Sequence, residues 1–142
     1  MISIKKIFII ILIFFSISNF FYSNINFKII LKIDNEIITS FDLEQESNYL
    51  LALNPRLKEI EKNVLMEIAK KSIIEETIRK NEILKHKQLN LKNSQIDNVL
   101  KNIIENLNLT NKIQLESYLK NFDISLEFLK KKIEIENEWK GL

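Results

Sequence analysis

The chain contains no cysteine, and its 142 residues include only one glycine, one proline and one histidine. Without cysteine there is no disulfide, no thiolate nucleophile and no Cys-based zinc site. One glycine disfavours a Gly-rich phosphate loop, and one glycine with one proline disfavours an all-β fold with many tight turns. These absences point towards a helical protein with few sharp turns.

The sequence contains few residues in patterns that are typical of a catalytic site. His86 is the only histidine, so it offers no His-based zinc site, and its place near the end of a predicted helix indicates a structural role. Carboxylates at consecutive or alternate positions of a helix do not face each other, so their spacing predicts surface charge instead of an acid–base pair. The carboxylates concerned are Glu75, Glu76, Glu134, Glu136 and Glu138. We predict no catalytic residue, no metal site and no cofactor.

Charge is balanced along the chain. Apolar residues make up 46% and charged residues 28%, the composition of a folding chain of one domain, and the net charge is +2. Acids and bases are interspersed, which argues against a nucleic-acid groove. We interpret Lys130, Lys131 and Lys132 as the solvated face of a helix.

Residues 1–23 have the layout of a secretory signal. Two lysines precede the apolar run Ile7–Phe15, and small residues allow cleavage before Asn19 or, less well, before Asn24. The apolar run is short for a transmembrane helix, yet an uncleaved N-terminal anchor is the alternative. Either interpretation places residues 24–142 outside the cytoplasm.

The next stretch predicts a small β-ribbon followed by a helix. Phe27–Ile33 is rich in β-branched residues, Asp34–Glu36 is a turn signal, and Ile37–Thr39 reads as a short returning strand. Thr39 is a candidate N-cap for the helix that follows, with Asp42 placed to complete a capping box. A ribbon of two strands is marginal alone, so we expect it to lie against helices.

A long helix is predicted over Glu61–His86, which contains neither glycine nor proline. Its apolar residues lie on several sides, so we expect shorter elements to pack around it as a central helix. Caps, breaks and apolar spacing predict the other helices at about 41–52, 94–107, 112–121 and 126–140. Asn54-Pro55 ends the first of these, Asn93 or Ser94 caps the second, and Ser125 caps the last. The predicted fold is mainly α, a helical bundle around one long central helix with a small N-terminal β-ribbon.

Six aromatic residues are spread over these helices. They either fill the core or line a groove for an extended or amphipathic peptide, because aromatic side chains offer a large contact area at low entropy cost. The six candidates for peptide binding are Phe41, Tyr49, Tyr118, Phe122, Phe128 and Trp139.

Four segments of the sequence match the pattern of one known family: KIDNEIITSFDLEQE (Lys32–Glu46), IAKKSIIEETIRKNEILK (Ile68–Lys85), LKNSQIDNVLKNI (Leu91–Ile103) and LKKKIEIE (Leu129–Glu136). Together with the order of the predicted elements, these segments resemble the SurA N-terminal domain. The resemblance extends over about residues 30–139.

The resemblance implies a periplasmic chaperone module of Gram-negative bacteria that binds unfolded outer-membrane β-barrel proteins, or other exported polypeptides, without ATP. It implies a SurA N-terminal-like domain over residues 24–142, incomplete at its C-terminus because no parvulin domain follows. Two alternatives stay open: the N-terminal fragment of a parvulin-type peptidyl-prolyl cis-trans isomerase, and a membrane-tethered helical interaction module. We expect no nucleic-acid partner, and membrane contact only through an uncleaved N-terminal segment.

Overall fold

The protein is described here from a computed structural model, which describes residues 27–89 and 94–142. This part of the chain folds into five α-helices, one 3-10 helix and a two-stranded antiparallel sheet, which confirms the predicted fold class. The predicted secretory segment lies outside the described residues, as do the side chains of the predicted caps Asn93 and Ser94. Within the described residues, no helix is both long enough and apolar enough to cross a membrane.

The predicted ribbon is present as β1 (Ile29–Ile33) and β2 (Glu36–Thr39). The strands pair antiparallel with an irregularity between Ile29 and Leu31, and Leu31 is paired with the buried Ile38. Asp34 has a φ of 51° in the turn, a conformation that aspartate tolerates better than most residues. Asp or Asn also takes a positive φ, a conformation in which many proteins place glycine, at two further connections. The three residues are Asp34, Asn108 and Asp123.

Helix α2 (Ser40–Leu53) starts as its sequence predicts. The backbone N–H of Asp42 donates to Thr39 Oγ1 at 3.3 Å, and the backbone N–H of Thr39 donates to Asp42 Oδ2 at 2.8 Å, which completes the capping box. The helix ends at Asn54, because the residue before a proline is pushed out of helical geometry. Pro55 then opens the 3-10 helix η1 (Pro55–Glu59).

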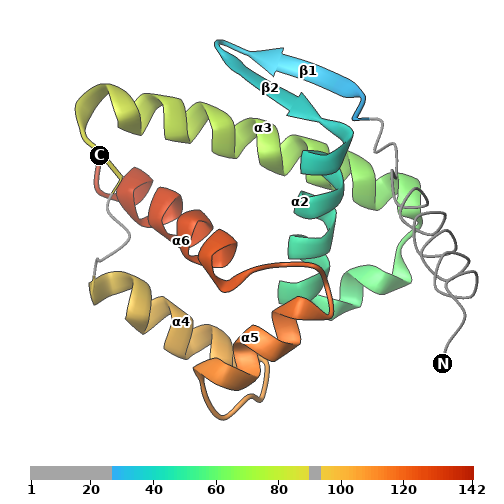
Figure 1. Cartoon of the computed structure of the whole chain (residues 1–142), viewed down its shortest axis with the longest axis vertical. Coiled ribbons are helices and arrows are strands. Elements are labelled where there is room, and N and C mark those ends of the chain that lie inside the picture. The colour runs from blue at the N-terminus through green and yellow to red at the C-terminus, as the bar shows by residue number, and fades with distance from the viewer. Residues whose placement is uncertain (1–26, 90–93) are drawn as a thin grey trace, which may run out of the picture.

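Helix α3 (Lys62–His86) is the longest element and runs along one side of the molecule, beneath the ribbon (Figure 1). It contacts α2, the last helix α6 and β1, and its buried residues are Leu65, Ala69, Thr77 and Ile83. Four of its other large apolar side chains are exposed, namely Val64, Ile68, Ile78 and Leu84, while Met66, Ile73 and Ile74 are half-buried. The expectation that shorter elements pack around α3 as a central helix is therefore met only loosely, because the helix is covered in part.

The remaining helices are α4 (Ser94–Asn106), α5 (Lys112–Lys120) and α6 (Leu126–Lys140). Asn111 Oδ1 accepts from the backbone N–H of Gln114 at 3.0 Å at the start of α5. Ser125 Oγ accepts from the backbone N–H of Phe128 at 3.0 Å at the start of α6, as predicted. The C-terminal end of α6 lies beside the end of α3, where an ion pair joins Glu138 to Lys87 (Figure 1).

The main apolar core lies away from the long helix. It is formed by buried residues of the end of α2, of α4, α5 and α6, and of the loop before α6, with no member from α3. Its members are Ala52, Ile96, Leu100, Leu115, Leu119, Ile124, Leu126, Leu129 and Ile133. Helices α2 and α6 each border both this core and α3, so the central position predicted for α3 is met only loosely.

Candidate functional site

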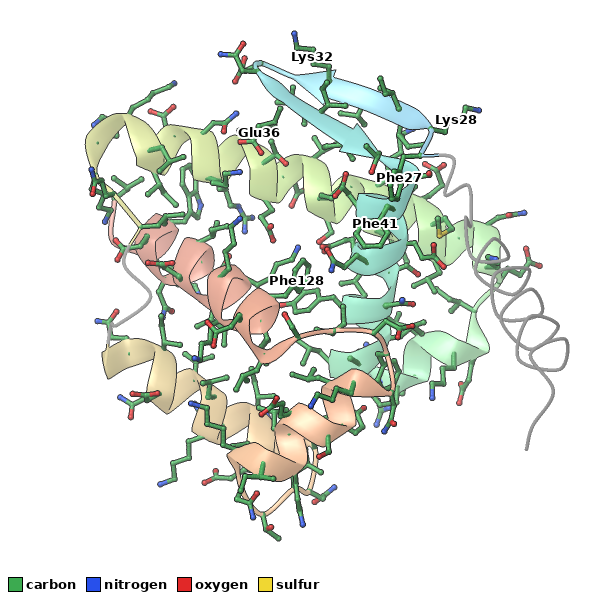
Figure 2. All side chains as sticks on the ribbon, viewed as in Figure 1. Phe27, Lys28, Lys32, Glu36, Phe41 and Phe128 are labelled. Atoms are coloured by element: carbon green, nitrogen blue, oxygen red, sulfur yellow. The ribbon has the colours of Figure 1, made fainter. Side chains whose placement is uncertain are left out.

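The six aromatic candidates do not meet in one groove. Phe41 is exposed at the start of α2, where its ring packs edge-on against Phe27 with 5.5 Å between centroids (Figure 2). Trp139 is exposed at the end of α6. The other four are half-buried and form two separate pairs. The structure therefore divides the candidates among different surfaces.

Tyr118 and Phe122 form the first pair, with 5.2 Å between ring centroids. The Tyr118 hydroxyl donates to the carbonyl oxygen of Ala52 at 2.9 Å, which ties α5 to the end of α2. Burial raises the pKa of the Tyr118 phenol, so the hydroxyl stays protonated as a donor. Lys58 Nζ lies 5.2 Å from the centroid of the Phe122 ring, within the range of a cation–π contact.

An open cleft of about 500 Å³ lies beside Tyr118, between the end of α2 and the end of α4. Its apolar walls come from Leu53, Pro55, Ile103, Leu107 and Tyr118, and its polar rim from Asn106 and Asn108. Asn108 takes the left-handed conformation with φ 55° and turns the chain sharply at the end of α4. A cleft of this size with apolar walls and a few polar groups suits an apolar or aromatic side chain of a ligand.

Tyr49 and Phe128 form the second pair, packed edge-to-face with 6.0 Å between centroids. Figure 2 shows Phe128 between α6 and α2. The Nζ of Lys132 lies 4.9 Å from the Tyr49 centroid and 5.3 Å from the Phe128 centroid. These rings thus face a buried cation, and their role is to enclose it.

Lys132 is held by two carboxylates from two other helices. Its Nζ contacts Glu46 of α2, and it lies 2.5 Å from Glu76 Oε2 of α3. The Lys132 side chain is 5% exposed and that of Glu46 1% exposed. The Ser72 hydroxyl donates to Glu46 Oε1 at 2.7 Å, which satisfies the second oxygen of that carboxylate. We call Lys132, Glu46 and Glu76 the ion triad; it joins α2, α3 and α6.

Burial sets the electrostatics around the ion triad. Desolvation raises the pKa of Glu76, and the attraction of Lys132 offsets that effect only in part. Desolvation, together with the negative charges of Glu46, Glu76 and Glu136, raises the pKa of the Tyr49 phenol far above its ordinary range. Tyr49 is therefore neutral at any physiological pH.

Two cavities flank the ion triad and share Glu76 and Lys132 in their walls. One, of about 250 Å³, reaches the ribbon at Glu36 and Ile38, and the other, of about 230 Å³, lies towards Arg79. In the part of the chain that the structure describes, no group of three or more His, Asp or Glu side chains is placed to hold a metal ion. The arrangement is suited to fixing three helices in register.

Sequence reasoning missed the ion triad. The interpretation of Lys132 as a solvated lysine is wrong, as is the assignment of Glu134, which is 2% exposed, to the surface. The spacing in the sequence could have indicated that Lys132 is buried. Lys132 follows Phe128 by four residues and Leu129 by three, so it lies next to both of these apolar residues on the surface of α6. Glu46 has no comparable signal, because its partners are distant in sequence.

Comparison with protein-family models, with curated proteins and with solved structures gave no match for this chain. The resemblance to the SurA N-terminal domain stays a prediction.

Proposed function

We propose that this chain is a periplasmic chaperone module that binds unfolded outer-membrane β-barrel proteins, or other exported polypeptides, without ATP. The open apolar cleft beside Tyr118 is the observation that carries the proposal. The signal-like pattern of residues 1–23 and the resemblance to the SurA N-terminal domain supply the compartment and the kind of client.

The chemistry of the client fits such a cleft. Strands of outer-membrane barrels alternate apolar and polar residues and carry aromatic girdles, and they aggregate when their edges are unpaired. The cleft accepts one apolar side chain at a time, while its polar rim leaves the neighbouring polar residues in water. Such a contact is weak and reversible, which is what a carrier needs in order to release its client.

Exposed apolar side chains elsewhere extend the surface available to a client. Large apolar residues are exposed at the base of the ribbon, along α3 and at the end of α6; examples are Phe41, Val64, Ile68 and Trp139. Each of these places offers apolar contact to a different part of an extended client. Several weak contacts along one extended client add up by multivalency.

The direct test is aggregation of an unfolded barrel protein diluted from urea, followed by light scattering. We expect the chain at several-fold molar excess to delay aggregation without nucleotide. No delay under these conditions contradicts the proposal. Mass spectrometry of the exported protein tests the compartment, since cleavage predicts a mature N-terminus at Asn19 or Asn24.

A pair of matched variants tests the cleft itself. Asn106→Arg places a charge at the cleft rim on the last residue of α4, where a cation suits the helix dipole. Asn102→Arg makes the same change on an exposed position of α4 that does not line the cleft. Because burying a charged group is unfavourable, we expect Asn106→Arg to weaken client binding about tenfold, and Asn102→Arg to leave it unchanged. Equal effects of the two variants would place client binding elsewhere.

A further inference from the structure

Strand β1 has one backbone edge that pairs with no strand in the described part of the chain. Within the described residues the sheet has only the two strands β1 and β2, and β1 forms the outer rim of the molecule above α3 (Figure 1). Just before β1, the carbonyl oxygen of Lys28 accepts from the backbone N–H of Ser40, the first residue of α2, at 2.8 Å. An edge of this kind is a template for another extended chain.

The outward face of the ribbon is apolar. Ile38 is 4% exposed and points towards the helices, so its neighbour Ile37 points the other way and is 54% exposed. Ile29 of β1 is 62% exposed, and the paired rings of Phe27 and Phe41 continue the apolar surface at the base of the ribbon. A strand added at this edge would find apolar side chains beside it.

The charged side chains in β1 and immediately before it are lysines, while Asp34 in the turn after β1 accepts from the side-chain amide of Asn81 at 3.2 Å. Lys28 and Lys32 are exposed at the two ends of β1, and none of the ion pairs among the described residues involves either of them (Figure 2). The acid on the neighbouring strand, Glu36, is already paired with Lys80 at 2.6 Å. The edge therefore offers two lysines without an acidic partner.

We propose that an extended segment of unfolded polypeptide adds to the β1 edge as a third strand, and that segments with acidic residues among their apolar ones are preferred. This inference rests on the proposed chaperone function and names the kind of segment it selects. Backbone hydrogen bonds along β1 hold any extended chain, while Lys28 and Lys32 select the acidic ones.

Charge also argues against a second copy of this chain as the occupant. Antiparallel pairing of two β1 strands centred on Ile30 would set Lys28 of each copy against Lys32 of the other. Like charges directly opposite each other destabilise a strand pair, and lysines on an edge are a common protection against self-association.

Fluorescence anisotropy with a labelled ten-residue peptide tests this inference on the full chain. The probe alternates Val or Phe with Glu, and the matched peptide carries Lys in place of each Glu. We expect the acidic probe to bind at least about fivefold more tightly, and the double variant Lys28→Glu with Lys32→Glu to reverse the preference. The control Lys101→Glu with Lys112→Glu makes the same charge change on two exposed lysines of α4 and α5, and we expect it to preserve the preference.

Backbone methylation separates strand addition from contact through side chains alone. Two versions of the acidic probe carry N-methyl groups on alternate residues, one set for each edge of the peptide. Only the set that faces β1 should abolish binding, because it removes the donors that the β1 carbonyl groups need. Equal binding of the two versions overturns the inference. So does a dimer of the chain alone, found by light scattering, that the single variant Lys32→Glu strengthens, because that variant sets opposite charges against each other across two paired β1 strands.

The aggregation assay distinguishes this inference from the function on which it rests. If the chain delays aggregation while the probe shows no preference for acid, the chaperone proposal stands and strand addition at β1 falls. If the chain neither delays aggregation nor binds either peptide, both fall.

Discussion

Helix α6 has two neighbourhoods that hold the protein together by different means. On one side Leu126, Leu129 and Ile133 are buried in the apolar core with α4, α5 and the end of α2. On the other side Lys132 lies in the ion triad with Glu46 of α2 and Glu76 of α3. A single turn of α6 thus carries both kinds of contact. Leu129 and Ile133 take part in non-directional apolar packing, and Lys132 makes an ion pair that depends on the position of single atoms.

The two neighbourhoods differ in what they tolerate. Apolar packing contributes in rough proportion to the buried area and accepts swaps of similar volume. A buried ion pair adds little net stability, because desolvation offsets the attraction, yet losing one partner leaves an uncompensated charge inside. We infer that the core supplies most of the stability and that the ion triad fixes how α6 sits against α2 and α3.

The largest effect is expected from Lys132→Met. The substitution keeps the length of the side chain but leaves Glu46 buried without its cation, so we expect a loss of about 4 kcal/mol in the free energy of unfolding. Urea denaturation followed by circular dichroism measures it. The exposed neighbour Lys131→Met should change the free energy by less than about 0.5 kcal/mol.

A compensating variant tells the two causes of that loss apart. Adding Glu46→Gln to Lys132→Met removes the stranded charge, so we expect the double variant to recover more than half of the lost free energy. If the double variant is no more stable than Lys132→Met alone, the loss comes from packing instead of charge, and the contrast between the two sides of α6 disappears.

The core is tested by Leu129→Ala. Leu129 is fully buried, and truncating a buried leucine removes transfer energy and leaves a cavity, so we expect a loss of about 3 kcal/mol by the same urea measurement. Ile113→Ala is the control, since Ile113 is exposed on α5 and should cost less than about 0.5 kcal/mol. A loss from Leu129→Ala no larger than that of the control would show that this core is loosely packed.

Local chemistry made much of the fold predictable from sequence. The capping box at Thr39, the cap at Ser125 and the stop at Asn54 depend on residues within four positions of each other, and all three are present. The turn at Asp34 was found for the same reason. Such features are encoded where they occur, so a single sequence is enough to find them.

Tertiary pairing was out of reach for the same method. Glu46 and Lys132 are 86 residues apart, and nothing local marks either as the partner of the other. The apolar residues of α3 suggested packing on several sides, but Val64 and Ile78 are exposed, because the neighbours of α3 among the described residues lie against other parts of the helix. Likewise, Tyr49 and Phe128 pair around a cation while Tyr118 and Phe122 pair beside a cleft. Helical spacing predicts which face of the helix a residue lies on, but it does not identify the residue that packs against it.

The smallest effect is expected from Glu76→Gln, and its sign is informative. Two carboxylates share one ammonium in the ion triad, so removing one charge leaves Glu46 and Lys132 balanced. Desolvation raises the pKa of Glu76 above its ordinary value of 4.5, which means that the folded protein prefers the protonated form more than the unfolded chain does. Neutral glutamine mimics that form, so at neutral pH we expect the variant to match or exceed the wild type by less than about 1 kcal/mol.

The dependence on pH follows from the same shift. As the pH falls towards the ordinary glutamate value of 4.5, the folded wild type takes up a proton at Glu76 before the unfolded chain does, so its free energy of unfolding gains a contribution that is lost again as the pH rises. The advantage of Glu76→Gln should therefore shrink on acidification, measured by urea denaturation at several pH values. Glu75→Gln removes the same charge from the more exposed neighbouring position and serves as the matched control at each pH. If the advantage of Glu76→Gln grows as the pH falls, the attraction of Lys132 lowers the pKa of Glu76 more than burial raises it. In that case the charged form of Glu76 stabilises the folded protein.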